Sequence, residues 1–256
     1  MTIIGGQLGY KLLRRISAKH LTTHEQSSED YYQDFERAGQ QLTDYFGDKL
    51  RERVKDKTVI DFGCGPGFEA IHLSQMGAGK VIGVDIQEKL LGHARDLAAK
   101  KSVSDRCTFT TNTDELADVV MSKDAFEHFD DPASILELMA DLLKPDGHIE
   151  IAFGPIWLHP YGGHLFSVFP WAHLIFTEEA LIRWRADFKT DGATKFSEVT
   201  GGLNQITIKK FEKIVANSSC KIEWLDTIPI RKLSIFKHKW LREFGSSIVC
   251  CRLVKK

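Results

Sequence analysis

The sequence lacks the features that mark a secreted, redox-active or membrane-spanning protein. It has five cysteines among 256 residues, and none has a second cysteine at the C-x-x-C spacing of zinc or redox motifs. No apolar run approaches the roughly 18 residues of a membrane span. The first 20 residues also lack the apolar stretch and small-residue cleavage site of a secretory signal. We therefore expect reduced thiols and a cytoplasmic protein.

A strong charge of one sign is absent as well. The 34 lysines and arginines nearly balance the 35 acidic residues, and the net charge is −1. Such a balance gives no general attraction to nucleic acid, so we expect no nucleic-acid partner. Residues 230–244 ("IRKLSIFKHKWLREF") mix basic and apolar side chains, which leaves peripheral membrane contact possible. A solvated helix face is the slightly favoured alternative for this stretch.

Short apolar runs alternate with amphipathic helical patterns through the middle of the chain. Strands are expected at 57–63, 80–86, 106–111, 117–123, 147–153, 220–230 and 247–256. Helices are expected between them at 68–77, 87–101, 134–143 and 206–218. Strands alternating with helices are typical of parallel strands joined by crossovers and covered on both faces. The sequence therefore predicts a doubly wound α/β sheet.

The stretch "VIDFGCGPGFEA", residues 59–70, places three glycines where the first strand ends. In open α/β sheets the ligand lies beyond the carboxyl ends of the strands, and glycine lets the backbone approach it closely. A dinucleotide site would have G-x-G-x-x-G, but Phe68 stands where its last glycine would fall. Asp61, just before the turn, would repel a pyrophosphate and suits a cationic or amine-bearing ligand.

The second expected strand ends near Asp85, which can accept hydrogen bonds from both hydroxyls of an unphosphorylated ribose. A glycine-lined turn, an acid for an ammonium or sulfonium group and an acid for a ribose together fit S-adenosylmethionine. A glycine loop alone would be weak evidence. The combination favours this cofactor over a nicotinamide dinucleotide.

Four segments carry a family resemblance: "VIDFGCGPG", "VIGVDI", "DVVMSKDAFEHFDDP" and "LLKPDGHIEIAF". In that order they resemble successive motifs of class I S-adenosylmethionine-dependent methyltransferases, over roughly residues 57–153. The run "FEHFDDPASILELMADLLKPDGH" is most similar to the ubiquinone-biosynthesis O-methyltransferase branch and its small-molecule relatives. The resemblance implies a Rossmann-like, mostly parallel seven-stranded sheet with a C-terminal antiparallel strand. It also implies cofactor contacts from Asp61, Gly63, Cys64, Gly65, Gly67, Asp85, Ile86, Asn112, Asp114 and Lys123, and S-adenosylhomocysteine as the product.

Asp124, Glu127 and His128 follow the fourth expected strand with the spacing D-x-x-E-H. On a helical turn all three side chains would share one face, so they are the catalytic candidates. Three interpretations stay open: the residues brace the loop, His128 is a general base, or the set holds Mg²⁺ as the resemblance allows. Two carboxylates and one imidazole are few ligands for Mg²⁺, so the sequence leaves the metal requirement open.

Residues 154–205 form an insertion rich in aromatic residues and histidine, without strand–helix alternation. Long insertions in compact domains are usually functional, and mostly apolar pockets with a few polar groups bind small molecules. The substrate-binding candidates are Trp157, His159, Tyr161, His164 and Trp171. A purely structural role remains the more probable one for either histidine alone.

The expected organisation is an N-terminal helical lid at 1–50 and a methyltransferase domain at 51–256. For the first 20 residues an interfacial membrane helix and an organellar presequence are alternatives to the lid. The expected reaction is methyl transfer to a small-molecule acceptor, at a hydroxyl of a quinone-like, lipid-linked or sugar substrate. Methylation of RNA or protein and cofactor binding without turnover are the alternatives. The sequence makes no prediction of the oligomeric state.

Overall fold

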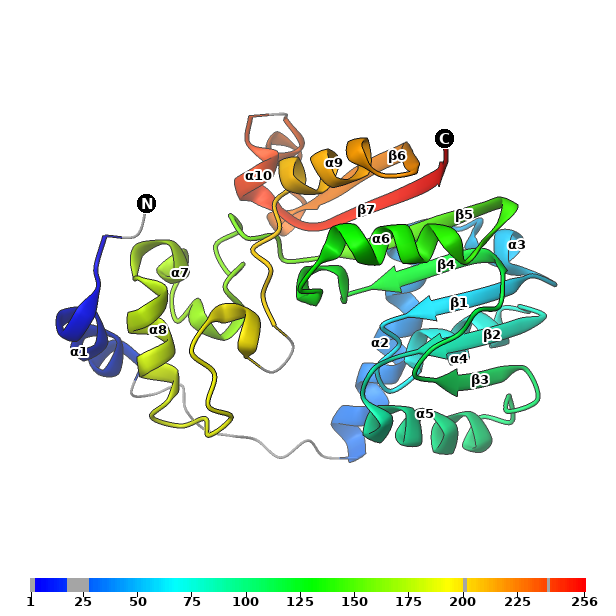
Figure 1. Cartoon of the computed structure of the whole chain (residues 1–256), viewed down its shortest axis with the longest axis horizontal. Coiled ribbons are helices and arrows are strands. Elements are labelled where there is room, and N and C mark those ends of the chain that lie inside the picture. The colour runs from blue at the N-terminus through cyan, green and yellow to red at the C-terminus, as the bar shows by residue number, and fades with distance from the viewer. Residues whose placement is uncertain (1–2, 18–27, 200–201, 239) are drawn as a thin grey trace.

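A seven-stranded sheet forms the centre of the molecule in the computed structural model, which describes residues 3–17, 28–199, 202–238 and 240–256 (Figure 1). The strands lie in the order β3-β2-β1-β4-β5-β7-β6. Their bounds are β1 Thr58–Phe62, β2 Lys80–Val84, β3 Cys107–Thr110, β4 Ala117–Lys123, β5 Leu143–Phe153, β6 Cys220–Pro229 and β7 Ser246–Lys255. Only β7 runs antiparallel to its neighbours β5 and β6. The predicted fold class is confirmed.

Helices cover both faces of the sheet. One face packs on α6 (Pro132–Asp141) and α9 (Ile208–Asn217), and the other on α2 (Ser28–Phe46), α3 (Leu50–Val54), α4 (Phe68–Gln75) and α5 (Glu88–Lys100). Alternate residues of a strand point to opposite faces, so Ile60 joins the α6–α9 side and Val59 the other. This two-sided burial explains why the strands read as continuous apolar runs.

A smaller lobe is built from the insertion after β5, together with the N-terminal helix (Figure 1). The insertion contains η2 (His164–Phe166), α7 (Ala172–Ile175), α8 (Glu178–Arg185) and η3 (Phe196–Glu198), and α1 (Gly6–Ser17) packs on α8. Leu13 of α1 shares a buried cluster with Trp184, whose indole donates to Ser17 Oγ at 2.6 Å. We call α1 with residues 154–205 the insertion lobe. The N-terminal segment 1–50, expected as one helical lid, is thus divided in the structure. Its first helix, α1, packs on the insertion, whereas α2 and the following α3 pack on the sheet.

Between β6 and β7 the chain projects as three short helices, η4 (Ile230–Lys232), η5 (Ser234–Lys237) and α10 (Arg242–Gly245) (Figure 1). We call residues 230–244 the tip segment.

No helix in the described ranges has the length and apolarity needed to cross a membrane. All five cysteines are buried and free, as expected of reduced thiols.

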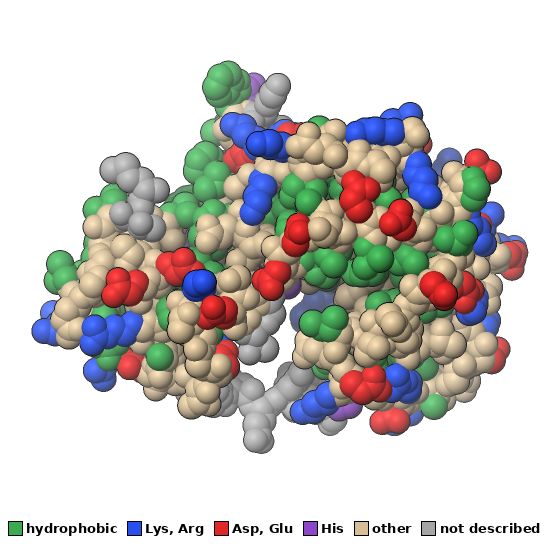
Figure 2. All heavy atoms as spheres, viewed as in Figure 1, with side chains coloured by type: hydrophobic (Ala, Val, Ile, Leu, Met, Phe, Trp, Pro, Cys, Tyr) green, Lys and Arg blue, Asp and Glu red, His purple; other side chains and the backbone are tan. Residues whose placement is uncertain are grey.

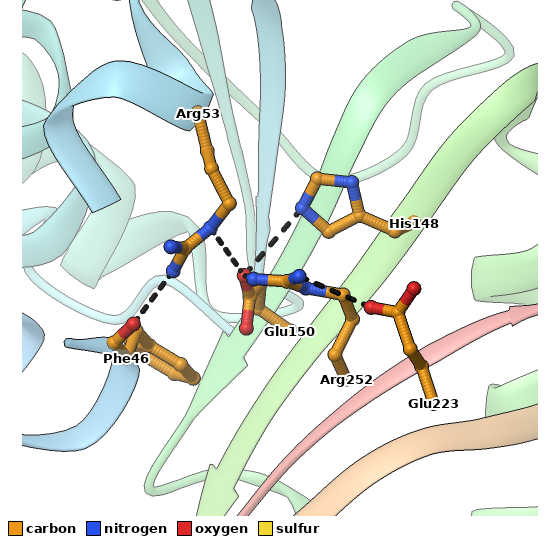
Figure 3. Close-up of polar contacts among 6 residues, drawn as sticks. All are labelled: Phe46, Arg53, His148, Glu150, Glu223 and Arg252. Atoms are coloured by element: carbon orange, nitrogen blue, oxygen red, sulfur yellow. Dashed lines mark hydrogen bonds and ion pairs between the residues drawn. The ribbon is translucent and has the colours of Figure 1, made fainter. Parts of the chain in front are cut away.

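A buried carboxylate links a helix on one face of the sheet to the antiparallel strands at its edge (Figure 3). Glu150 of β5 is fully buried, and its Oε1 accepts hydrogen bonds from Arg53 of α3 at 3.0 Å and Arg252 of β7 at 2.9 Å. Arg53 also donates to the Phe46 carbonyl at the end of α2, and Arg252 donates to Glu223 of β6. One carboxylate therefore ties α3 to the antiparallel edge of the sheet.

Replacing Glu150 with alanine should lower the free energy of unfolding by about 3 kcal/mol, because two partly buried guanidinium groups lose their shared, fully buried partner. Glu223→Ala is the matched control, since it removes an exposed partner of the same Arg252 and should cost at most about 1 kcal/mol. Urea unfolding followed by circular dichroism measures both. Equal losses in the two variants would contradict a special role for Glu150.

Candidate functional site

The turn after β1 brings the backbone of three glycines into left-handed conformations. Their φ angles are 81° at Gly63, 49° at Gly65 and 79° at Gly67. A Cβ at Gly63 would lie 2.7 Å from Ala125 Cβ, and one at Gly67 would lie 2.7 Å from Ala94 Cβ. Packing therefore requires these two glycines. A Cβ at Gly65 meets no atom within 4 Å, so the middle glycine faces open space.

Asp85 lies beside this turn at the end of β2. Its carboxylate oxygens accept hydrogen bonds from the amides of Gly65 at 2.9 Å and Gln87 at 2.8 Å. The side chain of Ile86, next in sequence, is 90% exposed. The Cys64 thiol instead points into the core, where burial raises its pKa, so only the backbone of Cys64 can meet a ligand.

Charged groups gather at the ends of β1 and β4. The Lys123 ammonium lies 3.1 Å from Glu69 Oε1 and also contacts the Asp124 carboxylate. Burial lowers the pKa of Lys123, but the two carboxylates outweigh it and hold this pKa above its ordinary value. Asp61 is 2% exposed, and its Oδ2 has no hydrogen-bond partner. Burial and the nearby Glu69 raise the pKa of Asp61 well above its usual range.

Two members of this cluster were not expected from the sequence. Glu69 lies in the first turn of α4, where an acidic residue is ordinarily explained by the helix dipole. Nothing further in the sequence indicates that Glu69 also pairs with Lys123. Tyr45 of α2 places its ring 5.8 Å from the Lys123 ammonium. Burial and the Asp124 carboxylate raise the pKa of Tyr45 to about 12. No spacing rule connects this tyrosine with residues almost 80 positions away.

Glu127 and His128 meet a histidine of the insertion lobe. Both lie in η1 (Phe126–His128), and one ligand atom from each lies within 4.8 Å of one from His164. Asp124 does not join them, because its φ of 51° precedes the helical turn and its carboxylate turns to Lys123. Burial raises the pKa of Glu127 to about 8, and burial with the neighbouring His128 lowers that of His164 to about 4.

The other substrate-side candidates divide into two groups. His159 is buried, its Nδ1 accepts from the Tyr161 amide at 3.0 Å, and burial lowers its pKa. Trp157 packs against His173 and Phe196 inside the insertion lobe. Both therefore stabilise the lobe. Tyr161 and Trp171 are 51% and 40% exposed, and their rings stay available to a substrate.

Asn112 and Asp114 follow β3, which pairs with β2 next to Asp85. Both side chains are exposed. The Asn112 carbonyl accepts from Thr110 Oγ1 at 2.9 Å, which fixes the start of this loop. An adenine contact by either residue stays a prediction.

The comparisons with known proteins agree with this geometry. A family model described as a methyltransferase domain matches residues 24–188. The chain belongs to this methyltransferase family. The predicted class I resemblance, and with it the expected enzyme class, is confirmed.

Among curated relatives, this methyltransferase is 37% identical over 103 residues to a ubiquinone biosynthesis O-methyltransferase of Neisseria meningitidis, covering 38% of this chain and 43% of that protein. It is also 37% identical over 103 residues to a ribosomal protein L11 methyltransferase of Vibrio vulnificus, covering 39% and 34%. The chain thus spans less than half the length of these relatives.

Among solved structures, the methyltransferase resembles magnesium protoporphyrin IX methyltransferase of Synechocystis with bound S-adenosylmethionine. The TM-score is 0.54 at 20% identity, over 98% of this chain and 92% of that one. Likeness at this identity supports the fold.

Replacing Lys123 with methionine should lower the free energy of unfolding by about 3 kcal/mol near pH 8, because Glu69 and Asp124 lose the buried ammonium that pairs with them. The pKa of Lys123 is raised in the folded state, so this loss should be present at neutral pH and should disappear only in alkaline solution, above the ordinary pKa of lysine. Lys144→Met, which removes a partly exposed partner of Asp118, is the matched control and should cost at most about 1 kcal/mol. A loss at Lys123 no larger than that of the control would contradict this electrostatic role.

Proposed function

We propose that this methyltransferase transfers the methyl group of S-adenosylmethionine to a hydroxyl of a small molecule. The observation that carries the proposal is the open cradle at Gly65. It lies between Asp61, whose carboxylate has an unpartnered oxygen, and Asp85, whose carboxylate is anchored by the turn itself.

These residues fit the parts of the cofactor. The raised pKa of Asp61 reflects a buried carboxylate that lacks enough positive charge nearby, and the ammonium or sulfonium of the cofactor supplies it. Each carboxylate can accept about four hydrogen bonds, so Asp85 keeps capacity for two ribose hydroxyls beyond the two amides. Exposed Ile86 offers apolar surface to the nucleoside.

The chemistry is a displacement at carbon. A lone pair of the acceptor oxygen attacks the methyl carbon opposite sulfur, the carbon–sulfur bond breaks with its electron pair on sulfur, and the hydroxyl proton is released. The protein's main task is alignment and exclusion of water, which can supply about 7–11 kcal/mol. His128 is our candidate for acting on the acceptor oxygen: it lies in η1, five residues after Lys123 ends β4.

The insertion lobe favours a small acceptor. The carboxyl ends of β1 to β4 point toward this lobe, and Figure 2 shows a hollow between the lobe and the sheet (Figures 1 and 2). We assign the acceptor to this hollow, with Tyr161 and Trp171 as ring contacts. The similarity to ribosomal protein L11 methyltransferases supports a protein acceptor as the alternative, and cofactor binding without turnover is a third outcome.

Incubation with methyl-labelled S-adenosylmethionine and an extract of the source cells tests the acceptor class. Products are separated into polar small molecules, lipids and macromolecules, and Asp85→Ala serves as the control. Label in the polar or lipid fraction that is absent with the control supports the proposal. Label in macromolecules only would overturn the acceptor class, and binding without any label would favour a non-catalytic role.

Gly65→Ala should weaken S-adenosylmethionine binding at least about tenfold by isothermal titration calorimetry, since its Cβ enters the cradle while nothing in the protein opposes it. Gly47→Ala is the matched control: its φ is 81°, its Cβ also meets no atom within 4 Å, and it lies outside the cluster. Both should lose about 1–2 kcal/mol of stability from left-handed strain. Equal cofactor affinity in the two variants would contradict the cradle.

The tip segment supports an acceptor held at a membrane. Hydrophobic side chains lie on the projection at the top of Figure 2. Five apolar side chains of the tip segment are exposed: Leu233, Ile235, Trp240, Leu241 and Phe244. Its only acid, Glu243, is buried and accepts hydrogen bonds from the first amides of α9, Ile208 and Lys209. The remaining charges of residues 230–244 are basic. We therefore propose that the tip segment rests on an anionic bilayer.

Co-sedimentation with phosphatidylglycerol vesicles tests this contact. The double variant Ile235→Ser/Trp240→Ser should bind at least about tenfold more weakly, since each inserted side chain contributes about 1.5–3 kcal/mol. Leu116→Ser/Leu138→Ser removes exposed apolar residues elsewhere, 47% and 45% exposed, and should bind normally. Failure of the unmodified protein to sediment with these vesicles would refute the proposal.

A further inference from the structure

The Mg²⁺ site allowed by the D-x-x-E-H spacing does not fit this structure. Its first residue, Asp124, is engaged by the Lys123 ammonium and stands apart from Glu127 and His128. Mg²⁺ prefers an octahedral shell of oxygen atoms. The groups that do converge are one carboxylate and two imidazoles, a set richer in nitrogen than Mg²⁺ selects.

Two residues of the group Glu127, His128 and His164 have buried atoms without a hydrogen-bond partner. Glu127 is 4% exposed and its Oε2 has no partner, and the buried Nε2 of His164 has none either. The imidazole rings of His128 and His164 lie 5.2 Å apart, centre to centre. Buried polar atoms normally have partners, so two unpartnered atoms in residues whose ligand atoms converge are consistent with a missing ligand.

The surroundings hold the side chains in metal-binding orientations. His128 Nδ1 lies 2.9 Å from the Gly202 carbonyl, which can only accept, so this nitrogen carries the proton and Nε2 keeps its lone pair. Metal-binding histidines usually donate their second nitrogen in this way. Glu127 Oε1 likewise accepts from the Gly154 amide at 3.1 Å, which leaves Oε2 free.

We propose that Glu127, His128 and His164 bind a divalent first-row transition ion of the Zn²⁺ type, with an open position for the acceptor. Two imidazoles and one carboxylate are a ligand set that zinc uses in catalytic sites. Around a tetrahedral ion with bonds of 2.0–2.1 Å, ligand atoms lie roughly 3.3 Å apart, so binding would draw ligand atoms that now lie within 4.8 Å of one another together by at most about 1.5 Å.

The ion gives His128 its role in the proposed methyl transfer, on which this step depends. Held by Glu127, His128 and His164, the ion would supply Lewis-acid chemistry that makes a nearby acceptor hydroxyl more acidic, and the hydroxyl proton would leave to solvent. The acceptor oxygen would donate its lone pair to the methyl carbon, and the carbon–sulfur electron pair would stay with sulfur. His128 thus acts as a ligand in this scheme, and the acceptor class narrows to hydroxyls that can reach the ion.

Zinc titration of the full, tag-free protein tests the site without cofactor or acceptor. Calorimetry should give one Zn²⁺ per chain, with no competition from Mg²⁺ in tenfold excess. His164→Gln and His128→Gln should each weaken binding at least about tenfold, because even residues behind the ligands contribute this much. His159→Gln, a buried histidine of the same lobe, should bind normally. Circular dichroism confirms that each variant is folded.

Three results would overturn the metal site: no zinc binding, unchanged affinity in His164→Gln, or effective competition by Mg²⁺. None of these results tests the proposed cofactor site at Gly65, so the proposal of methyl transfer is retained even if the metal site is refuted. If labelled product is found, removal of zinc with a chelator should abolish its formation while S-adenosylmethionine affinity stays within about twofold. Zinc binding without any methyl transfer would keep the metal site and reject the proposed function.

Discussion

Buried negative charge at the carboxyl ends of β1 and β4 is the constraint to which the rest of the site responds. Glu69 and Asp124 contact the buried Lys123 ammonium, and the buried Asp61 carboxyl lies near enough to feel both Glu69 and Lys123, so three acidic side chains depend on this cation. Charges removed from water are costly unless they are paired. The protein can neutralise the excess by taking up a proton, or a cationic ligand can neutralise it. A sulfonium compound with an ammonium group meets this electrostatic requirement.

The order of the strands gives this charge cluster its place. The sheet proceeds from β1 to β2 and β3 in one direction and from β4 to β5 in the other, and ligands bind where such an order reverses. Asp61 of β1 pairs with Met121 of β4, two residues before Lys123. The turns beyond these strands meet so closely that only glycine fits at position 63, against Ala125. The turn after β1, where we propose the cofactor, and the turn after β4, where we propose the acceptor, are therefore in close contact at Gly63 and Ala125.

Much of this arrangement could be predicted because it follows from local pattern. Strands buried on both faces give apolar runs, and acids at the ends of such runs lie at the carboxyl edge of the sheet, which is where the structure places Asp61 and Asp85. The alternation of such runs with helical patterns was likewise enough to predict the fold class. The boundaries were less regular: residues 144–146, which precede the strand expected at 147–153, lie within β5 where its pairing with β4 is interrupted. A sequence pattern predicts which face of the sheet a residue lies on more reliably than it predicts where the pairing of two strands is interrupted.

The remaining features depend on partners distant in the chain. Helical spacing predicted that Asp124 would lie beside Glu127 and His128. In the structure Asp124 has a left-handed φ and precedes η1, so it is not part of the same helical turn. His164 reaches the other two only because the insertion lobe folds back over the strand ends. The N-terminal residues divide between lobe and sheet for the same kind of reason, since the hydrogen bond from Trp184 to Ser17 joins residues 167 positions apart. Amphipathic patterns reveal that a helix has an apolar face and leave its partner undetermined.

Glu127 links the acceptor side to the root of the insertion lobe. One of its carboxylate oxygens accepts from Gly154, where the lobe leaves β5, and the carboxylate lies near His164 inside the lobe. Its backbone carbonyl accepts from the Asn204 amide, near the lobe's other end. Glu127 therefore contacts both ends of the lobe and its inner histidine, and it stands four positions after Lys123. The distance from the charge cluster to the proposed acceptor site is consequently spanned by four residues of backbone. Alignment of a methyl donor with its acceptor needs a fixed spacing of this kind.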